Sequence, residues 1–335
     1  MYYKQYEIKA INIIKSDSLQ ERMRRKVIQI AESTQLVSLP RKWAVQYGIK
    51  KGDELDVVEE GSRLIISTER KQEMGKITVD ISALDRDMMM FLLRALYKNG
   101  YDDITLWFKH PECLNFRTDK PEQIVDVLAT EVSRLNGVEI FTRRIDHCII
   151  RTISEDTAKV FDTMLRRTFL IFDETIKELI EGYETRNYSL LNTIQQKHDA
   201  ITKLIVYCQR LVNKLGYPDH RKTNTIYHIL EVLDTMMDFL KYNSRIIIEE
   251  KIHPSEQGIS ICASISKSFH TFYELYYDFK LEKVSELNKQ RHTFLKQIIV
   301  AQKKMKKNEL SFLSNMEQIF EHILNLTNAR IALEY

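Results

Sequence analysis

The sequence predicts a multidomain, predominantly α-helical protein with a small β head, a small α/β middle domain and a helical C-terminal half. The 335 residues include only nine glycines and five prolines, so helices can run long without interruption. Short segments of alternating apolar and polar residues, separated by turn residues, lie within the first 70 positions. After residue 154 apolar residues recur almost wholly with helical spacing.

The domain limits are expected where these patterns change. With 44% apolar and 29% charged residues, the composition is that of a soluble protein with substantial cores. No apolar run approaches the length of a bilayer span, and the first ten residues do not form a signal peptide, so we expect a cytoplasmic protein without membrane insertion. The predicted parts are an N-terminal segment at 1–20, the head at 21–70, the α/β domain at 75–153, and helical repeats at 154–252 and 255–335.

The head has a turn or cap residue at each expected boundary. Pro40 opens a brief helix, and Gly48 ends it by taking a left-handed conformation. A turn at 51–53 leads into two strands that are joined by a second turn at 60–62. A unit of this size has too little apolar surface to fold alone, so we expect it to complete its core with a second copy.

Two short motifs of the head resemble the SpoVT/AbrB swapped-hairpin family of DNA-binding domains, which also includes addiction-module antitoxins. They are Val37–Pro40, which reads VSLP, and Tyr47–Asp53, which reads YGIKKGD. The resemblance implies a homodimer in which two chains exchange hairpins and basic loop side chains contact DNA. This chain departs from the family at Gln35 and at 43–46, where arginines are common, so other cations would have to read the bases.

The head also contains a cluster of cations that suits contacts with DNA phosphates. Only two acids, Glu21 and Glu32, lie between residues 21 and 51, whereas the whole chain carries a net charge of just +3. The alternative is a solvated basic face on a module that only dimerises. The candidate DNA-binding residues are Arg22, Arg24, Arg25, Lys26, Arg41, Lys42, Lys50 and Lys51.

The middle segment predicts a small sheet with two helices on it. One helix is expected over 85–98, with Met88, Phe91, Leu92 and Leu96 on one face. Pro121 is expected to open the other, which runs to residue 135. Strands are expected at 77–81, 104–108, 138–141 and 148–153.

Six long helices are expected after Ser154, which would cap the first with Glu155 and Asp156 in its opening turn. Each has about 27 residues and a length of roughly 40 Å, which suits antiparallel bundles. Similar residues 86 positions apart, Leu230-Glu231 and Met316-Glu317, suggest a duplicated three-helix unit. The expected helices are 155–182, 187–214, 222–250, 255–280, 282–308 and 309–334.

The segment Met316–Asn325, which reads MEQIFEHILN, resembles the PhoU family. That family consists of six-helix proteins, built of two three-helix repeats, that regulate phosphate uptake. The resemblance therefore implies a PhoU-like pair of three-helix bundles in the C-terminal half. An AbrB-like head joined to a PhoU-like tail resembles the arrangement of archaeal phosphate-uptake regulators.

The same resemblance raises the question of a metal site, since some PhoU-like proteins bind iron or magnesium clusters through carboxylates spaced i, i+4. Glu317 and Glu321 match that pattern with one acid exchanged. Lys197 and Arg291 lie where further carboxylates are expected, and both would repel a cation. We therefore predict no complete cluster and no cofactor, and keep Glu317 and Glu321 as the candidate ligands of one residual divalent metal or iron ion.

The sequence shows no catalytic set. No GxxxxGK[ST], GxGxxG or HExxH pattern occurs, and the nine histidines form no Ser–His–Asp grouping. The four cysteines are widely spaced with no CxxC pair, which indicates reduced thiols. A basic run, Lys303 to Lys307, is typical of a solvated helix end, with contact to DNA or an acidic partner as the alternative.

These observations predict a non-enzymatic, DNA-binding regulator linked to phosphate uptake. Its helical half would bind a ligand or partner that reports phosphate status and would change how the dimeric head occupies an operator. One alternative is a scaffold that docks on a phosphate transporter ATPase or a kinase without touching DNA. The other is a bundle that stores or senses metal.

Overall fold

The computed structural model describes residues 24–30, 34–61, 63–68, 75–154 and 156–335. The chain forms two compact units, residues 1–73 and 74–335, here called the head unit and the main unit. The predicted N-terminal segment, Arg22 and Glu155 lie outside the described residues. Most of the described residues are helical, which confirms the predicted predominantly α fold class.

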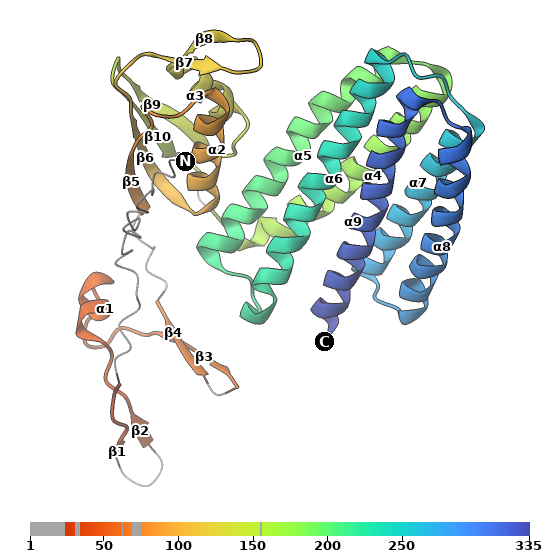
Figure 1. The fold of residues 1–335 in the computed structure, drawn as a ribbon. Helices are drawn as coiled ribbons and strands as arrows, with labels where there is room; N and C mark the ends of the chain where they lie inside the picture. The colour runs from red at the N-terminus through yellow and green to blue at the C-terminus, as the bar shows by residue number, and fades with distance from the viewer. Residues whose placement is uncertain (1–23, 31–33, 62, 69–74, 155) are drawn as a thin grey trace, which may run out of the picture. The chain divides into compact units, whose positions relative to one another are not determined.

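The head unit contains two antiparallel hairpins and a short helix (Figure 1). Strand β1 (Ile28–Ile30) pairs with β2 (Thr34–Leu36), and β3 (Asp56–Glu60) pairs with β4 (Arg63–Ser67). Helix α1 (Arg41–Gln46) follows Pro40, whose backbone is extended with ψ 123°. Gly48 has the expected left-handed conformation, with φ +58°. The brief helix after Pro40 and the two paired strands that follow it are confirmed, whereas the sequence indicates one short strand before the helix and the structure has two, β1 and β2.

The first part of the main unit is a four-stranded sheet with the order β5-β6-β10-β9. Strand β5 (Gly75–Asp80) is parallel to β6 (Tyr101–Trp107), and β10 (His147–Thr152) is antiparallel to both β6 and β9 (Val138–Arg143). Helices α2 (Arg86–Lys98) and α3 (Ile124–Ser133) cover one face of the sheet (Figure 1). The predicted small sheet with two helices is therefore present.

Pro121 does not open a helix. It lies in β8 (Lys120–Gln123), which pairs antiparallel with β7 (Glu112–Asn115), and α3 begins at Ile124. A two-stranded hairpin consists only of edge strands, where the missing N–H of a proline is tolerated. The prediction was wrong because proline at a first helical position and proline in an edge strand give the same sequence signal.

Of the four apolar residues expected on one face of α2, only Leu96 is buried. Met89, Met90 and Leu93 are buried, whereas Met88 is 42% exposed and Phe91 is 55% exposed. Eight of the nine positions from 88 to 96 are apolar, with Arg94 as the exception, so periodicity alone does not determine which side of the helix packs on the sheet.

The second part of the main unit consists of six helices in two groups of three (Figure 1). Within each group neighbouring helices pack together, and contacts of α6 with α9 and of α4 with α7 join the groups. This confirms the predicted pair of three-helix bundles. Among the described residues, no helix has both the length and the apolarity to cross a bilayer. The helices are α4 (Phe161–Thr185), α5 (Tyr188–Leu215), α6 (Thr223–Glu249), α7 (Glu256–Tyr277), α8 (Leu281–Lys304) and α9 (Leu310–Glu334).

Both predicted boundaries of α4 were wrong, and α8 ends at Lys304 and not at residue 308. Helix α4 begins at Phe161 and not after Ser154, because the Asp156 carboxylate is held by two cations of α5 and does not cap a helix. Nor does α4 break at Gly182, where an added Cβ would come within 2.7 Å of Leu191. The glycine therefore lets α4 and α5 pack closely, and the helix ends three residues later at Thr185.

Candidate nucleic-acid interface and carboxylate sites

Seven of the eight predicted DNA-binding residues are described, and all seven are exposed. They come from three short segments of the head unit: the chain before β1, the start of α1, and the turn after α1. The turn is fixed by a 2.8 Å hydrogen bond from the Lys50 backbone N–H to the Asp53 carboxylate. The seven are Arg24, Arg25, Lys26, Arg41, Lys42, Lys50 and Lys51.

The candidate DNA-binding cations and the exposed acids of the head unit lie in different segments of the chain. The cations lie between residues 24 and 51, and the exposed acids Asp53, Glu54, Asp56 and Glu59 follow them. A polyanion is therefore attracted to the first part of the unit and repelled by the β3 strand. This division favours phosphate contacts through α1 and its flanking segments.

The described residues of the head unit do not form a core of their own. Among its side chains whose exposure is described, none is buried. Val57 on β3 is 60% exposed and Leu64 on β4 is 67% exposed, although the two strands pair over five residues. Isolated two-stranded hairpins are marginal in water, and contiguous exposed apolar surface marks an interaction site. The unit thus requires another surface to cover these residues.

The candidate metal ligands lie on α9, where one of them is already paired. Glu321 accepts hydrogen bonds from the Arg291 guanidinium of α8, with an Nη2–Oε1 distance of 3.2 Å. Burial lowers the pKa of the neighbouring His322, which keeps that imidazole neutral. Within the described ranges no group of three or more His, Cys, Asp or Glu side chains could hold a metal ion. These residues do not fit a multinuclear cluster, and a single ion at Glu317 and Glu321 stays a prediction.

In the first three-helix group the positions that correspond to Glu317 and Glu321 are Glu231 and Thr235, and a shifted pair of acids on α6, Asp234 and Asp238, is satisfied by the protein itself. Asp238 pairs with Lys241 and with His198 of α5, whose Nε2 lies 3.0 Å from the carboxylate. Burial works to raise the pKa of Asp238, but these hydrogen bonds outweigh it and lower the pKa to about 2. Burial raises the pKa of Asp234, which accepts a 2.9 Å hydrogen bond from the Thr202 hydroxyl. A lysine ammonium thus supplies the cation beside these acids.

The Asp238 cluster predicts a pH-dependent contribution to stability. A shift of the Asp238 pKa from the usual 3.8 to about 2 corresponds to a contribution of about 2.5 kcal/mol to the free energy of unfolding. The Asp238 side chain is 39% exposed, however, so we expect Asp238→Asn to lower the free energy of unfolding by only about 1 kcal/mol near neutral pH. Because the folded-state pKa is lowered, this stabilisation is present above about pH 4 and lost as the pH falls towards 2. Denaturant titrations of both proteins across that range check it; a constant difference would contradict it.

The structure also contains a buried cation that the sequence did not single out. Arg210 of α5 is fully buried and donates to the carboxylates of Asp102 and Asp156. Its remaining N–H groups donate to the backbone oxygens of Tyr97 and Tyr101, at 3.0 and 2.9 Å, and to the hydroxyl of Thr152. Lys214, one turn along α5, donates to both of those carboxylates.

These contacts join the helical part of the main unit to the sheet part, because Asp102 belongs to β6 and Arg210 to α5. A signal for these contacts was available: Arg210 lies between the apolar run Leu204–Cys208 and the apolar pair Leu211 and Val212, all of which are buried. An arginine in such a place requires anionic partners. The partners themselves are more than 50 positions away in sequence, so they could not be named from it.

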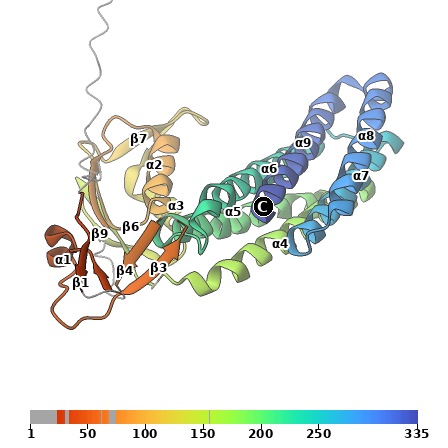
Figure 2. The same cartoon turned by 90° about the horizontal axis from the view of Figure 1, so that it is seen from below.

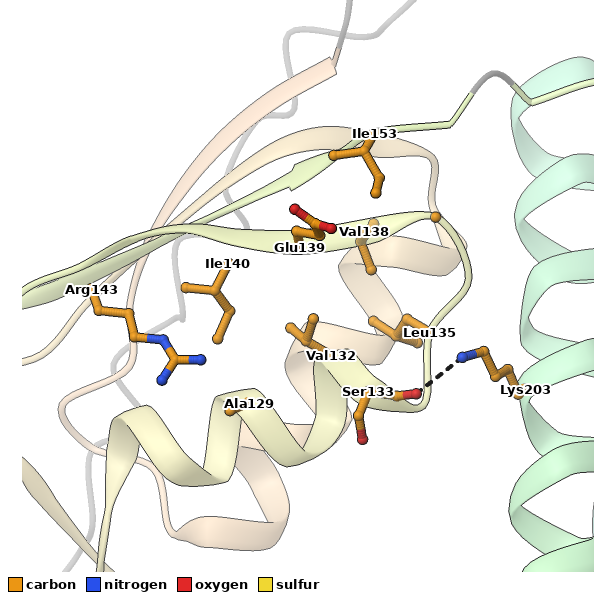
Figure 3. Close-up of a pocket in the computed structure, with 11 residues that line it drawn as sticks. Ala129, Val132, Ser133, Leu135, Val138, Glu139, Ile140, Arg143, Ile153 and Lys203 are labelled. Atoms are coloured by element: carbon orange, nitrogen blue, oxygen red, sulfur yellow. Dashed lines mark hydrogen bonds between the residues drawn. The ribbon is translucent and has the colours of Figure 1, made fainter.

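A groove of about 510 Å³ lies beside this joint, between α3, β9 and α5 (Figure 3). Most of its lining is aliphatic, including Val132, Leu135 and Ile140. Lys203 of α5 donates a 3.0 Å hydrogen bond to the backbone oxygen of Ser133 at the end of α3. Specific small-molecule sites have convergent polar groups. The charged residues of this lining are Glu139 and Arg143 of β9 and Lys203, which is already bonded to Ser133, and we assign no ligand to the groove.

Comparisons with known proteins bear on both units. Residues 28–73 match the family model described as antidote-toxin recognition MazE, bacterial antitoxin. This confirms the predicted relationship of the head to the class that includes addiction-module antitoxins. No curated protein matches the chain.

Among solved structures, the chain is similar to the crystal structure of the phosphate transport system regulatory protein PhoU from Streptococcus pneumoniae, with a TM-score of 0.41 and 15% sequence identity. The similarity covers 52% of this chain and 94% of that chain. At this score the second similarity says nothing of what the chain does, and the six-helix arrangement rests on the contacts described above.

Proposed function

We propose that this chain is a DNA-binding regulator that acts as a homodimer through its head unit. The observation that carries the proposal is the combination, in one small unit, of seven exposed cations with apolar side chains of which none is buried where its exposure is described. A second copy would cover the apolar residues and bring two sets of cations onto one platform. Clustered cations supply the sequence-independent part of DNA affinity.

Phosphate uptake is the process that we propose it regulates. The support is the sequence resemblance of Met316–Asn325 to the PhoU family, joined in one chain to a DNA-binding type of head. The helical half would bind a ligand or protein that reports phosphate status, and binding would favour one of two states of the chain. Cytoplasmic localisation belongs to the same proposal, since both the operator and such a reporter are found there.

The test of DNA binding starts from a selection, because the operator is unknown. Full-length protein selects from a pool of random duplexes, and a selected duplex then serves in a gel-shift assay against a scrambled one. Enrichment of a common sequence supports the proposal. Retention of no duplex at low salt would contradict it and would favour the scaffold, in which the head only dimerises.

The proposed dimer predicts a disruptive double substitution in the β3–β4 hairpin. Val57→Asp with Leu64→Asp places two charges where we expect apolar contacts with the second copy, so the variant should run as a monomer in size-exclusion chromatography with light scattering. Leu170→Asp is the matched control, since Leu170 of α4 is similarly exposed, at 52%, in the main unit. An unchanged dimer in the double variant would show that this hairpin is not the interface.

A further inference from the structure

The C-terminal two-thirds of α8 is free of acidic residues. From Leu287 to Asn308 the chain contains seven lysines and arginines and not one aspartate or glutamate. Of these cations only Arg291 has an ion pair among the described residues, with Glu321. The other six are lysines, and all of them are exposed: Lys289, Lys296, Lys303, Lys304, Lys306 and Lys307.

Three of these lysines form a straight line on the outer side of the helix. Lys289, Lys296 and Lys303 recur every seven residues, which is two helical turns, so they stand about 10 Å apart. The opposite side of α8 is the buried one, with Leu287, Phe294, Ile298 and Ala301 packed inwards. Helix α8 packs against α7 and α9 and lies at the outer edge of the bundle (Figures 1 and 2).

Two aliphatic side chains stand among the lysines. Ile299 is 54% exposed and Val300 is 45% exposed, and both flank the line from Lys296 to Lys303. The acid that shares this surface is Glu256 of α7, which lines a groove of about 400 Å³ together with Lys296 and Lys304. Further exposed acids, Glu249 and Glu250, lie at the end of α6.

We propose that this face of α8 binds the anionic surface of a lipid bilayer. Clusters of four to eight cations on an amphipathic helix are typical of contacts with anionic headgroups. Exposed aliphatic side chains within such a cluster suit the interfacial region of a bilayer, whereas they gain nothing against DNA phosphates. Lysine, a hydrated point charge, suits diffuse attraction to headgroups; arginine would favour paired recognition of a phosphate. The helix would lie on the surface and would not cross it.

The experiment uses the full chain in a background that removes the head's own attraction to anions. Arg24, Arg25, Arg41 and Lys42 are changed to glutamine, and co-sedimentation is measured with phosphatidylcholine vesicles that either contain or lack phosphatidylglycerol. We expect binding only to the anionic vesicles, with affinity that falls as salt is raised. Adding Lys289→Gln, Lys296→Gln and Lys303→Gln should weaken it about a hundredfold, at about 1 kcal/mol per lysine.

Control substitutions keep the outcome interpretable. Lys109→Gln, Lys120→Gln and Lys159→Gln remove the same charge from exposed lysines elsewhere in the main unit and should leave vesicle binding unchanged. Glutamine is a good helix former, and circular dichroism checks that α8 stays folded. The proposal is overturned if anionic vesicles are not bound, or if the α8 and control variants behave alike. It is also overturned if the glutamine background binds duplex DNA through α8 more tightly than it binds vesicles.

Discussion

Charge reversal at Arg24, Arg25, Arg41 and Lys42 will abolish DNA binding by the full-length chain while its dimer stays intact. The four side chains are exposed on the head unit, so reversing them changes the field at the platform without altering a buried contact. DNA affinity depends mainly on such phosphate contacts, and reversal replaces attraction by repulsion. Gel shifts with the selected duplex measure the loss, and sedimentation measures the dimer.

Salt dependence tests the same claim on the unchanged protein. A dimer that neutralises about six phosphates should lose about a thousandfold in affinity between about 50 and 200 mM salt. The matched control reverses Lys109, Lys120, Arg144 and Lys159, which are exposed cations of the main unit, and should bind nearly as the unchanged protein does. A gel shift that survives the head reversal would exclude this surface as the DNA contact.

Replacing Arg210 by methionine will strongly destabilise the main unit. The substitution removes the buried guanidinium and leaves the carboxylates of Asp102 and Asp156 with Lys214 as their remaining cationic partner. Removing one partner of a buried ion pair costs about 3–5 kcal/mol, because the opposite charge stays buried. Denaturant unfolding followed by circular dichroism measures the loss in free energy of unfolding.

The control for that experiment is Arg221→Met. Arg221 also pairs with an aspartate, Asp219, but its side chain is 87% exposed, so its loss should change stability little. A second variant, Asp156→Asn, tests whether charge is the cause: it should destabilise less than Arg210→Met, since it removes one of two anions. Equal, small effects of the two arginine variants would show that the joint does not depend on Arg210.

Most of the fold could be predicted from the sequence, because its signals are local. Gly48 ends a helix through its own backbone freedom, and Met316-Glu317 repeats Leu230-Glu231 at a fixed distance. These features depend on neighbouring residues or on repetition, which a sequence shows directly. The head relationship, the small sheet and the six helices in two groups followed from them.

The predictions were wrong where contacts between residues distant in sequence determine the local structure. The position of Asp156 predicts that it lies in the first turn of a helix, but its carboxylate pairs with Arg210 and Lys214 and the helix begins later. Gly182 predicts a helix break, but the helix continues through it, and the missing side chain lets Leu191 pack closely there. One partner of Asp238 was hidden for the same reason, since His198 lies 40 positions away on another helix. The DNA contacts of the head stay predictions, since neither DNA nor a second copy accompanies the chain.

The mass of the full-length protein in solution tests the central claim most directly. If two heads interlock, sedimentation equilibrium will give twice the chain mass of 39.7 kDa, and the selected duplex will bind two chains together. A single-chain mass at concentrations that saturate the duplex, with one chain bound per duplex, would contradict the account.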